Sequence, residues 1–260
     1  MKNTPTIDQI QYLFTFPFED EGWKQKFLIA FLLSVAGFFI PIIPWIFIAG
    51  YTAKIIEVVI KEDQYHLPEW DDWGNFFMDG LRLVALGFIA VLPFLLLMGL
   101  AYAFMFAPIF IGEDTFFGND IFTPWVFTSM LGMFASMFII GFAVFFFVLL
   151  GVFFPAAMTH MIAEDTFSAA FRIKEWWPIF KTNLWGYVIS FILLLGTTYL
   201  MMFAFQLFYM TIILCCLIPF ISSVLSVYIS IFTGAVFGQT YRVGREKSEL
   251  GSGADEEEEN

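Results

Sequence analysis

The segment from Leu67 to Gly80 carries the side chains with the clearest capacity for chemistry. Its acids and tryptophans are Glu69, Trp70, Asp71, Asp72, Trp73 and Asp79. Carboxylate oxygens are the usual ligands of Ca²⁺ and Mg²⁺, and the neighbouring His66 could add a ring nitrogen, so one interpretation is a cation site. The other interpretation needs no ligand, because Asp71 or Asp72 can cap a following helix while the remaining acids stay in water. We expect capping and solvation.

His160 is the second candidate, because it ends a long apolar stretch and is followed closely by Glu164 and Asp165. Ionisable groups at membrane depth often belong to proton relays. This histidine, however, falls at a predicted cytoplasmic boundary of the membrane. We therefore expect an interfacial histidine without a special role, with a relay as the alternative.

Long stretches around these candidates contain no Asp, Glu, Lys or Arg; they cover residues 83–112, 121–159 and 182–241. Ion-coupled transporters and proton pumps keep such residues within the bilayer, and intramembrane hydrolases need a nucleophile with its base or a set of metal ligands. The only cysteines, Cys215 and Cys216, are adjacent, which suits neither a disulfide framework nor a metal site. We therefore expect no enzymatic activity, no cofactor and no bound metal.

The composition indicates where these residues act. The chain of 260 residues is 60% hydrophobic and 14% charged, whereas soluble domains have about 45–50% apolar and about 25% charged residues. A soluble fold of this size would still leave about a quarter of its unfolded-chain surface in water, so we expect an integral membrane protein. The net charge of −12 argues against binding nucleic acid and against a polybasic grip on anionic lipid.

Apolar stretches and basic residues together predict an all-α transmembrane bundle of about six membrane helices, with both termini on the cytoplasmic side of the cell membrane. A span needs about 20 residues, so residues 182–241 must hold two spans. The basic residues form four clusters, which the positive-inside rule assigns to the cytoplasm. Residues 27–53 lie between two of these clusters and must enter the bilayer and return, with the break at Pro41 and Pro44. One long helix followed by an amphipathic helix is the five-span alternative.

Three regions are expected along the chain. Residues 1–26 form a cytoplasmic interfacial segment, residues 27–248 a single transmembrane helical domain, and residues 249–260 an acidic disordered tail.

Amphipathic helices are expected at the membrane surface. A capping pattern predicts a short helix from Ile7 to about Phe16, which Pro17 ends. The acids at 19–21 suit the first turn of the next helix, because they face the positive end of its dipole. Residues 67–80 form a second surface helix whose tryptophans bury in the headgroup boundary.

Small residues recur at every fourth position of the last predicted span. They are Ser222, Ser226, Ser230, Gly234 and Gly238, and a shorter stripe elsewhere is Gly99, Ala103 and Ala107. This spacing places each set along one helix face, where small side chains let another helix approach closely. Packing inside the subunit is the main expectation, and a contact between subunits or a pore lining are the alternatives.

Two sequence motifs are distinctive. The first runs from Phe16-Pro17-Phe18 to Trp23, and the second is Leu67-Pro68-Glu69-Trp70-Asp71-Asp72-Trp73-Gly74. Together with the apolar hairpin between them, they resemble a prokaryotic membrane-protein family known as domain of unknown function 4013, over roughly residues 10–245. The resemblance implies a membrane location and no known activity.

The first functional hypothesis is a non-enzymatic membrane protein that works through helix packing and association. Its partners are membrane lipids and copies of itself or another membrane protein, and not nucleic acid. The alternative is a passive permease or channel for a neutral or apolar compound, because a proline-broken hairpin can line a cavity. A weaker third hypothesis is a lipid-acting enzyme that uses the cytoplasmic acids.

Overall fold

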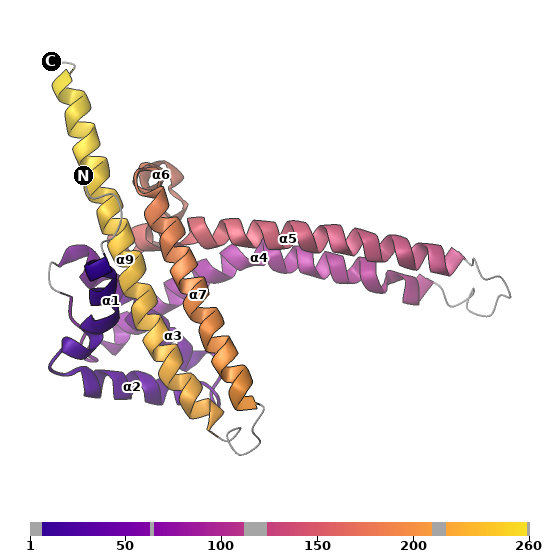
Figure 1. Cartoon of the computed structure of the whole chain (residues 1–260), viewed down its shortest axis with the longest axis horizontal. Helices are drawn as coiled ribbons and strands as arrows, with labels where there is room; N and C mark the ends of the chain where they lie inside the picture. Colours follow the sequence, from indigo (N-terminus) through magenta and orange to yellow (C-terminus); the bar gives the residue numbers. More distant parts are fainter. Residues whose placement is uncertain (1–6, 63–64, 112–123, 210–216, 259–260) are drawn as a thin grey trace. The chain divides into compact units, whose positions relative to one another are not determined.

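The structure, a computed structural model, describes residues 7–62, 65–111, 124–209 and 217–258 (Figure 1). This part of the chain contains helices and no strand, which confirms the predicted all-α class. The helices are α1 (Ile7–Glu19), α2 (Trp23–Ala36), α3 (Ile43–Lys61), α4 (Trp73–Ile111), α5 (Pro124–Ala163), α6 (Ile173–Thr182), α7 (Leu184–Tyr209) and α9 (Ile218–Glu258), with a 3-10 helix, η2 (Phe167–Phe171), before α6.

Five helices, α3, α4, α5, α7 and α9, are long and apolar enough to cross a membrane. The predicted hairpin is present, because α2 ends at Ala36 and α3 begins at Ile43, with Pro41 in the reversal and Pro44 in the first turn of α3. The alternative of one continuous helix is therefore wrong. The predicted sixth helix is short: the 14 residues of α2 rise about 21 Å, less than a hydrocarbon core of about 30 Å.

By their contacts the residues form two compact units, where the sequence suggested one helical domain. Unit 1 contains residues 1–86 and 152–260, and unit 2 contains residues 87–151. In its described part, unit 2 is a pair of helices from α4 and α5. Ala101 and Ala143 are buried between them, and most of the large apolar side chains of the pair point outward.

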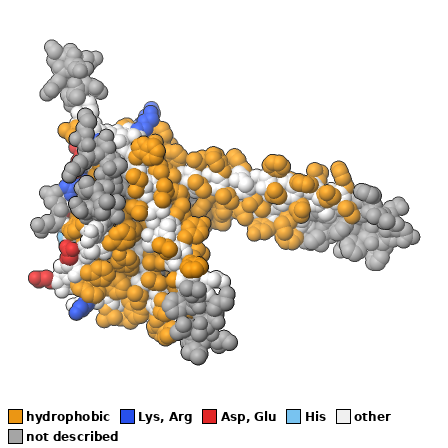
Figure 2. All heavy atoms as spheres, viewed as in Figure 1, with side chains coloured by type: hydrophobic (Ala, Val, Ile, Leu, Met, Phe, Trp, Pro, Cys, Tyr) orange, Lys and Arg blue, Asp and Glu red, His pale blue; other side chains and the backbone are white. Residues whose placement is uncertain are grey.

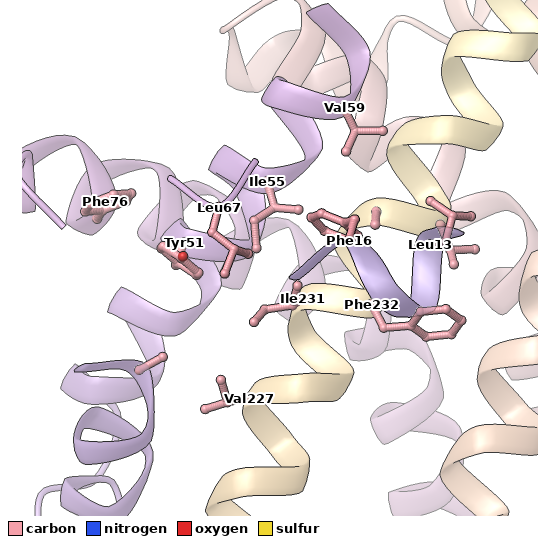
Figure 3. Close-up of a cluster of buried hydrophobic side chains, with 13 residues drawn as sticks. Leu13, Phe16, Tyr51, Ile55, Val59, Leu67, Phe76, Val227, Ile231 and Phe232 are labelled. Carbon is pink, nitrogen blue, oxygen red and sulfur yellow. The ribbon is translucent and has the colours of Figure 1, made fainter. Parts of the chain in front are cut away.

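The core of unit 1 forms where α9 packs against α3, with α1 beside them. Figure 3 shows Leu13 and Phe16 of α1 and Ile55 of α3 directed toward Ile231 and Phe232 of α9. These side chains come from the two ends of the sequence. The tertiary fold of unit 1 therefore depends on the N-terminal helix as well as on the last span.

The glycines of the α9 stripe provide this close packing. An ideal Cβ at Gly234 would lie 3.2 Å from the carbonyl oxygen of Thr52, and one at Gly238 would lie 3.0 Å from the side chain of Val59. Both glycines are buried. These two glycines therefore pack inside the subunit.

Helix boundaries differ from the prediction at three places. Helix α1 continues through Pro17 to Glu19, so Pro17 lies in its last turn and does not end it. Residues 67–80 do not form a separate surface helix, since α4 begins at Trp73 and continues into the apolar stretch without a break. Helix α9 reaches Glu258 and so includes most of the segment expected to be a disordered tail.

Candidate functional site: the contact between the two acidic-aromatic motifs

Lys26 joins the two distinctive motifs of the sequence. Its side chain is almost fully buried, with 7% of it exposed. The Nζ atom lies 3.0 Å from the carboxylate of Asp20 and 2.8 Å from that of Glu69, and it donates a hydrogen bond of 2.7 Å to the carbonyl oxygen of Leu67. All three ammonium protons therefore have acceptors, and the motif at 16–23 is fixed to the motif at 67–74.

Asp20 completes this buried arrangement, which we call the Lys26 clamp (Asp20, Lys26, Leu67 and Glu69). Its carboxylate accepts the backbone N–H groups of Gly22 at 2.9 Å and Leu67 at 3.1 Å. Burial raises the pKa of Asp20, but the hydrogen bonds from Lys26 and the two N–H groups outweigh it, so the pKa is lowered overall. Burial lowers the pKa of Lys26, and hydrogen bonds to Glu69 and Asp20 outweigh this effect, so that pKa is raised.

The acids at 19–21 thus serve a different purpose from the one predicted. Helix α2 begins at Trp23 and has no acid in its first turn. Asp20 instead links the loop before α2 to the loop before α4. A carboxylate that accepts hydrogen bonds from a buried lysine and two backbone N–H groups is stabilised more than a carboxylate in water near the end of a helix.

Trp70 is half-buried and packs against other parts of the protein. Its ring stacks on Tyr51 at 4.3 Å, and its indole N–H donates to the carbonyl oxygen of Lys26 at 3.0 Å. The hydroxyl of Tyr51 donates to the carbonyl oxygen of Pro68 at 3.2 Å. Trp70 thus packs partly against protein, and the placement of both tryptophans in the headgroup boundary stays a prediction. Trp73 remains exposed and touches Phe47 edge-on.

Helices α3 and α4 cross beside the clamp with their backbones in contact. An ideal Cβ at Gly50 would lie 2.6 Å from the carbonyl carbon of Phe76, and one at Gly80 would lie 2.8 Å from that of Ile46. Real Cβ atoms essentially never come within 3.0 Å of such atoms. Only glycine fits at these two positions, which sets the start of α4 against α3.

The acids of the 67–80 segment do not converge on one point. Asp72 caps α4, accepting the N–H of Asn75 at 3.1 Å, as expected for Asp71 or Asp72. Asp79 pairs with Arg82 at 3.2 Å, and Glu69 belongs to the clamp. In the described ranges, no three His, Cys, Asp or Glu side chains gather as metal ligands would. The alternative interpretation as a cation site therefore receives no support from the geometry.

Two open clefts lie near these acids, with volumes of about 260 Å³ and about 270 Å³. Lys54, Asn75 and Asp79 line both of them. The carboxylates there are partly neutralised, because Glu57 pairs with Lys54 at 2.7 Å. Polar and apolar side chains both line the two clefts, and among the described residues that line them none forms a nucleophile–base pair.

His160 is buried within the protein, and its predicted place at the membrane boundary stays a prediction. Its Nδ1 lies 2.8 Å from the hydroxyl of Tyr241, and its Nε2 lies 3.2 Å from the carboxylate of Glu175. Glu175 also pairs with Arg172 at 2.9 Å. The hydrogen bond with His160, followed by that with Arg172, lowers the pKa of Glu175. The predicted neighbour Asp165 instead pairs with Arg82 at 2.7 Å.

Sequence reasoning did not single out Lys26, Gly50 or Tyr241, although each is central to a buried contact. Lys26 had a signal: it is a base beside an apolar run, six residues after an acid. No such signal marks Gly50 or Tyr241, because the residues that they contact, Phe76 and His160, lie far from them in the sequence.

Comparison with known proteins gives one match. The profile of a family described as "Protein of unknown function (DUF4013)" matches residues 32–208. This range contains the motif at 67–74 but not the motif at 16–23, so it is shorter than the predicted resemblance. No curated protein and no solved structure matches the chain.

Proposed function

Because this chain belongs to the family of proteins of unknown function DUF4013, we propose that it is a non-enzymatic multi-pass membrane protein that acts through association. Its helices would pack against copies of itself or another membrane protein and organise the lipid around them. The family assigns no activity, so the proposal depends on the surfaces of the molecule.

The surface of unit 2 carries the proposal. Its described residues, 87–111 and 124–151, include no charged side chain. Phe138 is 79% exposed and Phe127 70% exposed, and Figure 2 shows hydrophobic side chains over the visible face of these helices. Apolar surface of this extent needs lipid or protein to cover it.

The free small-residue stripe supports a contact between copies on α4. Gly99 and Ala103 are exposed, and an ideal Cβ at Gly99 would meet no atom within 4 Å. In contrast, Gly234 and Gly238 of α9 are already used within the subunit. We therefore expect any small-residue contact between copies to involve α4.

The test compares Gly99→Ile with Gly234→Ile by light scattering in mild detergent and in lipid nanodiscs. Gly99→Ile is expected to shift the wild-type oligomer toward monomer with an unchanged melting temperature. Gly234→Ile is expected to lower the melting temperature, because its side chain meets α3. A wild-type protein that is monomeric under every condition would contradict the proposal, as would an oligomer that Gly99→Ile leaves unchanged.

We further propose that both termini lie in the cytoplasm and that the protein resides in the cell membrane. Basic segments meet at one end of unit 1, where Arg242 donates to the carbonyl oxygen of Glu62 at 2.6 Å and Lys247 donates to Asn183 at 3.3 Å. A single cysteine at position 63 is expected to react with reagents from the cytoplasmic side, and reaction from outside would reverse the topology. Passive transport through the Pro41–Pro44 hairpin stays a prediction.

A further inference from the structure

Helix α6 has one buried face, flanked by a more exposed row of side chains. Trp176 and Phe180 are buried in a cluster with Ala156 and Tyr187. Ile173, Trp177 and Lys181 form a row along the flank of this buried face, since residues four apart lie one above the other on a helix. The ring of Trp177 stacks on Phe180 at 5.6 Å and is 37% exposed. A short helix with one face packed and a half-exposed tryptophan beside it is typical of the boundary between lipid headgroups and hydrocarbon.

Exposed aromatic side chains also flank α6 in the sequence. Phe171 of η2 is 52% exposed, and Trp185 at the start of α7 is 71% exposed. Water alone is a poor environment for so many large apolar groups, whereas the glycerol and upper acyl region of a bilayer suits both their rings and their indole N–H groups.

The lysines of α6 differ from the other bases in their lack of acidic partners. Over the described ranges, seven bases form ion pairs with carboxylates: Lys26, Lys54, Lys61, Arg82, Arg172, Arg242 and Arg245. The described bases for which no ion pair is found are Lys24, Lys174, Lys181 and Lys247. Of these four, Lys174 and Lys181 belong to α6, and Lys247 contacts the residue that follows it.

The three lysines lie around one short stretch of helix. Lys174 and Lys181 are exposed, and the Nζ of Lys181 lies 5.6 Å from the centre of the Trp177 ring. Lys247 of α9 lies near the C-terminal end of α6, because it donates a hydrogen bond of 3.3 Å to Asn183, the residue that follows α6. The nearby Glu175 does not neutralise them, because it is already bound to Arg172 and His160.

We propose that this surface, formed by Lys174, Trp177 and Lys181 of α6, binds the headgroup of an anionic membrane phospholipid. A protein with a net charge of −12 repels anionic lipid over most of its surface. An anionic headgroup should therefore bind where positive charge is in local excess, as it is at these lysines. The lysines bind the phosphate, while Ile173 and Trp177 contact the glycerol and upper acyl chain. The inference depends on the membrane location in the proposed function and not on association between copies.

The experiment measures the binding of phosphatidylglycerol and phosphatidylcholine to the full-length protein by native mass spectrometry in a neutral detergent. The test variant is the double substitution Lys174→Gln with Lys181→Gln. The control is Lys61→Gln with Arg245→Gln, which removes the same charge from two exposed bases that already have carboxylate partners. Melting temperatures of all variants establish that each is folded.

Wild-type protein is expected to bind phosphatidylglycerol in preference to phosphatidylcholine. Each lysine near an anionic surface contributes about fivefold in affinity, so the test variant, which lacks two lysines, should bind phosphatidylglycerol about 25-fold more weakly. The control should change by less than about twofold. Equal binding by wild type and test variant, or equal weakening in test and control, would overturn the inference. Displacement of the bound lipid by inorganic phosphate would also overturn it, because the site would then belong to a free anion.

Discussion

Replacing Gly80 by alanine tests whether the crossing of α3 and α4 depends on backbone contact. A Cβ at this position would overlap the carbonyl oxygen of Ile46. It would lie 2.8 Å from the carbonyl carbon of Ile46 and 2.9 Å from the backbone nitrogen of Gly50, whereas ordinary contacts begin at 3.4 Å. The two helices would therefore have to separate by more than the 0.6 Å that the carbonyl carbon alone requires. No side chain can rotate away to relieve the contact, because the opposing atoms belong to the backbone.

The size of the effect follows from this separation. A gap of about 0.5–1 Å removes a quarter to a half of the dispersion energy of each contact across an interface, and overpacking of this kind costs about 1–3 kcal/mol. Alanine returns at most about 1 kcal/mol through its higher helix propensity. We therefore expect Gly80→Ala to lower the free energy of unfolding by about 2 kcal/mol.

The control is the same substitution on the same helix. An alanine at Gly87 would meet no atom within 4 Å, so Gly87→Ala should leave stability unchanged or raise it by up to about 1 kcal/mol. The measurement is unfolding by sodium dodecyl sulfate in mixed micelles, followed by circular dichroism. If Gly80→Ala is as stable as wild type, or if both variants lose the same stability, the reasoning about the crossing is refuted.

Three further predictions concern the buried polar groups of unit 1. Lys26→Met should lower the free energy of unfolding by about 3 kcal/mol, because it leaves the buried carboxylate of Asp20 without its cation, whereas exposed Lys24→Met should change it by less than about 0.5 kcal/mol in the same assay. The stability contributed by Asp20 should be complete above its ordinary pKa of 3.8 and be lost at lower pH, since its folded pKa is lowered. That of Lys26 should be complete below its ordinary pKa of 10.5 and be lost at higher pH, since its folded pKa is raised. Melting temperatures across pH should show both limits in wild type and a smaller alkaline loss in Lys26→Met. Tyr241→Phe should cost about 1–2 kcal/mol of unfolding free energy, because Nδ1 of the buried His160 loses its partner; a variant that melts like wild type would contradict this.

The acidic-aromatic segment shows how far local reasoning reached. A helix cap needs only a carboxylate three residues before an N–H group, so the cap by Asp72 was predictable from spacing. The packing of Trp70 against other parts of the protein was not, because an aromatic ring suits a membrane interface and a protein interior equally well. Its environment was decided by Tyr51 and by the carbonyl oxygen of Lys26, which lie 19 and 44 residues away in the sequence.

The sequence by itself determined the all-helical membrane character of this protein and the reversal between α2 and α3. Both follow from local properties, since an uncharged stretch of sufficient length forms a helix in lipid and prolines interrupt it. Only the tertiary structure decided that α3 and α4 cross at Gly50 and Gly80, and that Gly234 packs on α3 while a Cβ at Gly99 would meet no other part of the chain. It also decided that Lys247 lies near the end of α6, which carries Lys174 and Lys181. A membrane helix is apolar on all sides, so its hydrophobic pattern does not distinguish the face that meets protein from the face that meets lipid. That choice depends on shape and charge complementarity between segments that are distant in the chain.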